Sequence, residues 1–84
     1  MNATADQILA LLHQIAPDVD PSGVDRSLPL PDQLDLDSMD YQSLLAAISK
    51  RYAMPIPEAD VAALRSVDDL TAYVEAHAGA ARIG

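Results

Sequence analysis

The hydrophobic residues of this chain are almost all aliphatic, and this limits the folds open to it. Half of its 84 residues are hydrophobic, but they include no Phe and no Trp, and three tyrosines supply the aromatic content. A core must therefore be built mainly from Leu, Ile, Val and Ala, a mixture that favours packed helices. At this length we expect one small domain that has no room for a large enclosed active site.

The spacing of the apolar residues predicts where the helices lie. Apolar residues recur every three or four positions in several stretches, and no stretch alternates as a strand would. We predict an all-α domain, a small bundle of three main helices and one short helix, over about 5–16, 37–52, 58–64 and 66–79. Pro17 ends the first helix, Pro57 suits the first turn of the short one, and Gly79 stops the last.

The second predicted helix has two different faces. The face expected to meet the core is an apolar stripe of Tyr41, Leu44, Leu45, Ile48 and Tyr52. The row expected to face solvent is Met39, Ser43, Ala46 and Lys50.

Residues 17–36 join the first two helices and show no regular period. They hold four of the six prolines, so we expect a long loop that scattered apolar side chains pin to the core. A loop of this length in so small a domain usually has a function. We expect residues 1–84 to form a single domain, with its core over about 4–78 and a flexible tail over 79–84.

The charge of the chain narrows the choice of partners. Thirteen acidic residues against five basic ones give a formal net charge of −8. Such a field repels phosphate backbones and anionic lipid, so we expect neither nucleic acid nor a membrane as a partner, and basic proteins are favoured instead. The chain has no cysteine, and no signal or membrane-spanning pattern is found. We expect a monomer in the cytoplasm.

One hydroxyl stands among carboxylates where the second helix is predicted to start. The segment reads Leu34-Asp35-Leu36-Asp37-Ser38-Met39-Asp40. A helix N-terminus offers free backbone N–H groups and a partial positive charge, so a phosphodiester on Ser38 would lie where anions are well tolerated. Asp37 and Ser38 are also common N-cap residues, and on local sequence alone capping is a sufficient explanation.

The same segment and the residues after it resemble the acyl carrier protein family. An Asp-Ser-Leu or Asp-Ser-Met triplet opens the second helix in that family, and Asp37-Ser38-Met39 matches it. An Ile-Pro pair precedes the family's short third helix, as Ile56-Pro57 does in this chain. The match also includes the apolar positions and an aromatic residue at Tyr52, and it extends over about residues 37–77.

The resemblance implies a carrier that catalyses nothing. Ser38 would carry a 4′-phosphopantetheine arm, transferred from coenzyme A by a phosphopantetheinyl transferase (holo synthase), and Asp37 would help to present the serine. The arm would hold acyl intermediates as thioesters, supplied by a loading ligase and passed to acyl-transfer enzymes of a specialised lipid or secondary-metabolite pathway. The alternative cargo is an amino acid loaded by a free-standing ligase. The residues that would meet partner enzymes are Met39, Asp40, Ser43, Ala46 and Lys50.

The chain departs from the family at two places. Asp35 and Leu36 stand where the family usually has Gly and a small residue. Family members carry glutamates on the face that meets partners, where this chain has Ser43, Ser49 and Lys50. We expect Lys50 to weaken the attraction of basic partner enzymes.

A shelter for the cargo would need space within the bundle. Small and β-branched apolar side chains leave space that Leu or Phe would fill. The residues predicted on this ground to line the shelter are Ala47, Val61 and Ala63.

Other functions fit the sequence less well. Asp18, Asp20 and Ser22 resemble half of a calcium loop, but Pro29 stands where the bidentate Glu is needed. Asp35-x-Asp37 lacks the strand and the scaffold of a phosphoryl-transfer enzyme. His13 and His77 have no local partner, so we predict no metal site. A helical interaction module that is never modified remains an alternative.

Overall fold

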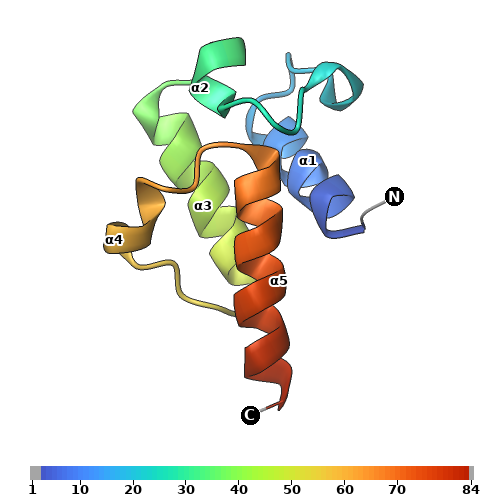
Figure 1. Cartoon of the computed structure of the whole chain (residues 1–84). Helices are drawn as coiled ribbons and strands as arrows, with labels where there is room; N and C mark the ends of the chain where they lie inside the picture. Colours follow the sequence, from blue (N-terminus) through green and yellow to red (C-terminus); the bar gives the residue numbers. More distant parts are fainter. Residues whose placement is uncertain (1–2, 84) are drawn as a thin grey trace.

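The chain folds into helices joined by short connections. The computed structural model describes residues 3–83, and side chains over residues 3–77. Figure 1 shows three main helices, α1 (Ala3–Ile15), α3 (Ser38–Tyr52) and α5 (Val67–Ile83). The shorter elements are η1 (Pro21–Gly23), α2 (Leu30–Gln33) and α4 (Glu58–Val61). The described part contains no strand, and the all-α prediction is confirmed.

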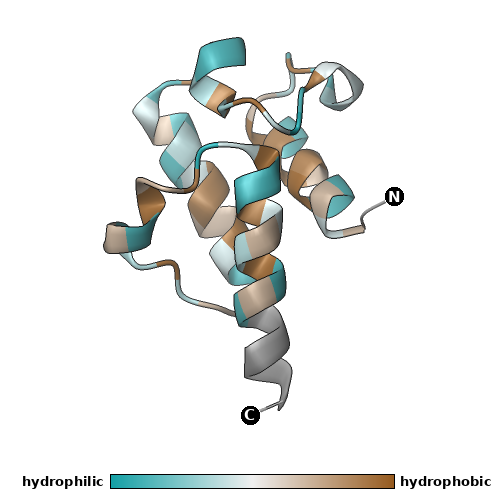
Figure 2. Ribbon diagram, viewed as in Figure 1, coloured by the Kyte–Doolittle hydropathy of each residue, from teal (hydrophilic) through white to brown (hydrophobic). Residues whose placement is uncertain are grey.

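The core lies where the three main helices meet. Helix α1 packs against both α3 and α5, and hydrophobic and hydrophilic residues alternate along these helices (Figure 2). The residues buried most completely are Ile8, Leu12, Leu30, Leu44, Ile48, Val67 and Leu70. The predicted stripe of α3 is confirmed, since Leu44, Leu45 and Ile48 are buried and both of its tyrosines are partly buried. This packing fixes α3 against the rest of the molecule.

The connection between α1 and α3 is more ordered than predicted. Instead of a plain loop it contains η1 and α2, which both have proline in the first turn, where a missing N–H costs nothing. The expectation that it is pinned to the core is confirmed. Leu30 is fully buried, and its N–H donates to the carbonyl of Arg65 at 2.7 Å. The carbonyl of Arg26 accepts from the N–H of Asp68 at 2.9 Å.

Three predicted helix boundaries are wrong by a few residues. Helix α1 begins at Ala3, and α4 ends at Val61, after which the chain continues in turns to Leu64. Helix α5 does not stop at Gly79 but continues to Ile83. A single glycine costs a helix only about 1 kcal/mol, and alanine, the best helix former, stands on both sides of it.

The flexible tail predicted over 79–84 concerns residues whose side chains lie outside the described part, and Gly84 lies outside it altogether. That expectation stays a prediction. Within the described residues, no helix has the length and apolar character needed to cross a membrane.

Candidate functional site

Asp37, not Ser38, caps the N-terminus of α3. Asp37 has extended backbone angles, and its Oδ1 accepts a hydrogen bond from the N–H of Asp40 at 2.8 Å. Ser38 is therefore the first helical residue, and capping does not occupy its side chain. Ser38 is exposed, and no hydrogen-bond partner for its hydroxyl is found within residues 3–83. One residue holds the helix end while its neighbour presents a free hydroxyl.

The surroundings of Ser38 combine a favourable helix end with acidic side chains. The first N–H groups of a 15-residue helix lie at this end, where the helix dipole favours an anion. Asp35 and Asp37 are exposed, and Asp40 is half-buried. A phosphodiester on Ser38 would be stabilised by the backbone, and the carboxylates would attract a basic partner protein.

Four of the five predicted partner-facing residues form an exposed row along α3, and the fifth, Asp40, is half-buried. Ser43, Ala46 and Lys50 are exposed, and Met39 has 74% of its surface accessible. An apolar side chain this exposed next to Ser38 suits contact with a protein that approaches the serine. The structure thus brings these residues together, and their role in partner binding stays a prediction.

Ser49 does not belong to this row. Its hydroxyl donates to the carbonyl of Met54, and the N–H of Met54 donates to the carbonyl of Ser49 at 3.1 Å. Between them Ala53 adopts left-handed angles, φ 51° and ψ 47°, and ends the helix. The serine at this family position therefore stabilises the C-terminus of α3. The sequence contains no signal for this, since neither Gly nor Asn marks the end.

The predicted cargo shelter is only partly supported. Ala47 and Val61 are half-buried against the core, whereas Ala63 is exposed. Ala63 was expected in the wall because it is small and apolar, but α4 ends at Val61 and Ala63 lies exposed in the turn that follows. Ala63 is therefore removed from the site.

Tyr73 on α5 packs against the core and also contacts α4. Its hydroxyl donates to Oδ2 of Asp60 at 2.8 Å, joining the single turn of α4 to α5. This hydrogen bond is the main cause of a raised pKa for Tyr73. The ring stacks on His77 with centroids 3.9 Å apart, and Nδ1 of His77 lies 2.8 Å from the carbonyl oxygen of Tyr73.

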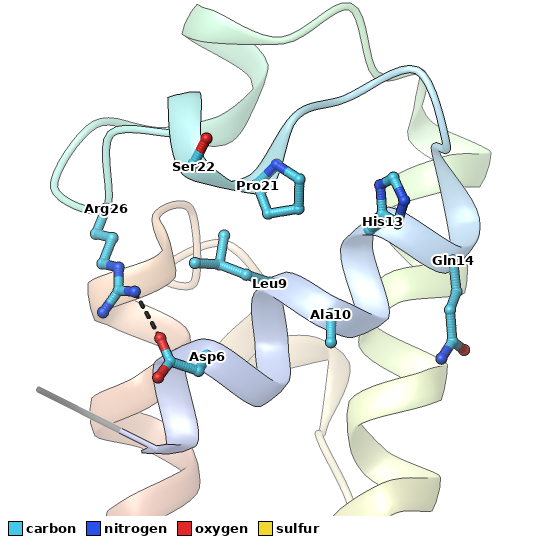
Figure 3. Close-up of a pocket in the computed structure, with 8 residues that line it drawn as sticks. All are labelled: Asp6, Leu9, Ala10, His13, Gln14, Pro21, Ser22 and Arg26. Atoms are coloured by element: carbon cyan, nitrogen blue, oxygen red, sulfur yellow. Dashed lines mark hydrogen bonds and ion pairs between the residues drawn. The ribbon is translucent and has the colours of Figure 1, made fainter.

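A hollow of about 590 Å³ lies between α1 and η1, and it is open to solvent (Figure 3). Its lining includes Leu9, Pro21 and Arg26, and Arg26 forms an ion pair with Asp6 at 2.7 Å. Neither Ser38 nor any residue of the predicted shelter lines it. Its ion pair ties the connection to α1 and gives the hollow a structural role.

The segment that resembles half a calcium loop forms a turn. Oδ1 of Asp20 accepts hydrogen bonds from the N–H of Ser22 at 3.0 Å and from its hydroxyl at 2.8 Å. These bonds lower the pKa of Asp20. The carboxylate is thus engaged in shaping the first turn of η1.

Comparison with known proteins agrees with this geometry. A family model described as a phosphopantetheine attachment site matches residues 6–74, which include α3 and Ser38. The chain is 35% identical over 78 residues to the meromycolate extension acyl carrier protein of Mycolicibacterium smegmatis, covering 89% of this chain and 79% of that protein. It is 33% identical over 78 residues to the acyl carrier protein of Rhodococcus erythropolis, covering 89% and 86%.

Proposed function

The chain belongs to the acyl carrier protein family, whose cofactor is 4′-phosphopantetheine, and we propose from this premise that Ser38 is the residue that carries the arm. The observation that supports Ser38 most strongly is its free, exposed hydroxyl at the first position of α3, beside a separate cap residue. No other serine of the chain has the Asp-Ser-Met context.

Loading would use the Ser38 hydroxyl as the nucleophile. Its oxygen attacks the pyrophosphate of coenzyme A, so the phosphate that bears pantetheine stays on Ser38 and the nucleotide leaves. The hydroxyl proton passes to the transferase, which supplies the catalytic groups. Asp37 fixes the backbone of the first turn and so presents Ser38, while the N–H groups of that turn favour the new phosphodiester.

The carrier would deliver acyl groups within a specialised pathway. The arm ends in a thiol that holds acyl groups as thioesters. A relative whose name specifies meromycolate extension supports a specialised lipid pathway. We propose that the exposed row on α3 meets the loading ligase and the acyl-transfer enzymes, and that the carrier itself catalyses nothing.

The carrier would act as one domain and as a monomer. One core, built from α1, α3 and α5, supports a single carrier domain over residues 1–84. We place it in the cytoplasm.

A thiol count tests this function sharply, because the chain has no cysteine. The purified chain should show no reactive thiol, and after incubation with coenzyme A and a broad-specificity phosphopantetheinyl transferase it should show one thiol per chain. Ser43→Ala, another exposed serine on α3, should gain the thiol as the wild type does. Ser38→Ala should gain none. A wild-type chain that stays free of thiol would refute the proposal and favour an unmodified interaction module.

A further inference from the structure

The hydroxyl of Tyr41 is buried without a partner. Tyr41 lies in the first turns of α3, and its ring packs against the core. Its hydroxyl oxygen is inaccessible to solvent, and no hydrogen bond to it is found within the described residues. An unpaired buried hydroxyl is costly, and native proteins keep few of them. Packing alone does not explain a tyrosine at this position, because phenylalanine would fill the same space without the cost of an unpaired hydroxyl.

The position of Tyr41 relates it to Ser38. The two residues are three apart on one helix, so their side chains leave neighbouring parts of the same surface. Burial raises the pKa of Tyr41, the charge of Asp69 raises it further, and the charge of Arg65 opposes the rise, so both charged groups act on the hydroxyl. The hydroxyl is therefore protonated at neutral pH and able to donate.

The carboxylate whose charge raises the pKa of Tyr41 is already engaged. Oδ2 of Asp69 accepts from the N–H groups of Arg65 and Ser66, both at 3.2 Å, and the N–H of Asp69 donates to the hydroxyl of Ser66 at 3.0 Å. This pairing caps α5. Asp69 thus serves the end of a helix, and the donor of Tyr41 stays unused.

Helix α4 has few attachments to the rest of the bundle. Helix α4 is a single turn between Pro57 and Ala62, and one side-chain hydrogen bond, from Tyr73 to Asp60, links it to α5. Val61 on α4 and Ala47 on α3 are only half-buried. A displacement of α4 would leave the packing of α1 against α3 and α5 in place.

We infer that the hydroxyl of Tyr41 donates a hydrogen bond to a carbonyl oxygen on the loaded arm when the arm folds back from Ser38 against α3 and the connection between α4 and α5. This inference rests on the proposed function. The acceptor is an amide carbonyl of the arm or a carbonyl of the cargo, such as the 3-oxo group of a 3-oxoacyl thioester. In the second case Tyr41 makes the carrier distinguish 3-oxoacyl cargo from saturated cargo.

The test compares wild type with Tyr41→Phe in four forms: without the arm, with the arm, with a saturated acyl thioester, and with the 3-oxoacyl thioester of the same length. Intact mass confirms each form before its melting temperature is measured. Without the arm, Tyr41→Phe should melt at or above the wild type, because it loses an unpaired hydroxyl. In the form that supplies the acceptor, the melting temperature of the wild type should exceed that of Tyr41→Phe by roughly 4–8 °C.

The form in which the difference first appears identifies the acceptor. If wild type and Tyr41→Phe already differ when the arm is unloaded, the acceptor is an amide carbonyl of the arm. If the difference starts with the saturated thioester, the acceptor is the thioester carbonyl. If the difference is confined to the 3-oxoacyl form, the acceptor is the 3-oxo group of the cargo.

Thr71→Val is the matched control. Thr71 is 6% exposed, and its hydroxyl is likewise buried without a partner. Thr71 comes two residues after Asp69 on α5, so the two side chains project in directions about 200° apart around the helix axis. Its substitution should shift all four forms equally. If Tyr41→Phe also shifts all four equally, the inference is overturned while loading at Ser38 stands. A chain that never acquires the arm overturns the proposed function and this inference together.

Discussion

The two ends of α3 are built for opposite purposes. At the N-terminal end the backbone is fixed by Asp37, while Ser38 and Met39 point into solvent. At the C-terminal end Ser49 bonds to the carbonyl of Met54, and the side chain of Met54 is 4% exposed. The difference shows how so small a domain can present a reactive group: one end of the helix is anchored in the core, so the other end needs few contacts of its own.

The largest effect on stability is expected from a substitution in the core between the two ends of α3. Ile48 is fully buried, and Ile48→Ala should lower the free energy of unfolding by about 2–5 kcal/mol. Urea unfolding measures the loss. The rate of arm transfer per folded molecule should stay at the wild-type value, because Ser38 lies more than two turns away. A fall in rate larger than the fall in folded protein would show that the two ends are not independent.

A matched pair of substitutions separates the ends directly. Asp37→Ala removes the cap and should cost about 0.5–2 kcal/mol, and Ser49→Ala removes a hydrogen bond worth about 0.5–1.5 kcal/mol. Both variants should therefore unfold at similarly lower urea concentrations. Only Asp37→Ala should slow arm transfer from coenzyme A. Equal slowing in both variants would mean that stability, and not the presentation of Ser38, controls loading.

The smallest effect concerns the exposed row near the middle of α3. Ser43→Glu with Lys50→Glu should raise the rate at which basic enzymes of general fatty-acid synthesis use the loaded carrier. An exposed charge contact is worth about 0.2–1 kcal/mol and is screened by salt, so the gain should be modest and fade at high salt. Equal rates for wild type and double variant at low salt would exclude this row as a determinant of partner choice.

The sequence is sufficient to predict the parts of α3 that depend on local patterns. Its buried stripe follows from helical spacing, and its start follows, to within one residue, from the Asp-Ser pair that precedes the stripe. The choice between Asp37 and Ser38 as the cap could not be made, because both residue types cap helices well. Only the backbone geometry decides it.

The remaining features depend on contacts between distant residues. Helix α2 is one turn, too short to show a period, and it is fixed by burial of Leu30 and by the carbonyl of Arg65, 35 positions away in the numbering. The left-handed Ala53, the bond from Ser49 to Met54 and the unpaired hydroxyl of Tyr41 have no local signature either.

The most direct test of the proposed function determines which residue carries the arm. The chain is incubated with coenzyme A and the transferase and then fragmented, and the added mass of phosphopantetheine is located by tandem mass spectrometry. We expect the added mass on Ser38 alone. Ser38→Ala should remain unmodified, and its free energy of unfolding should stay within about 0.5 kcal/mol of wild type, because Asp37 still caps the helix. Phosphopantetheine on any other residue, or a loaded Ser38→Ala chain, would contradict the assignment of the arm to Ser38.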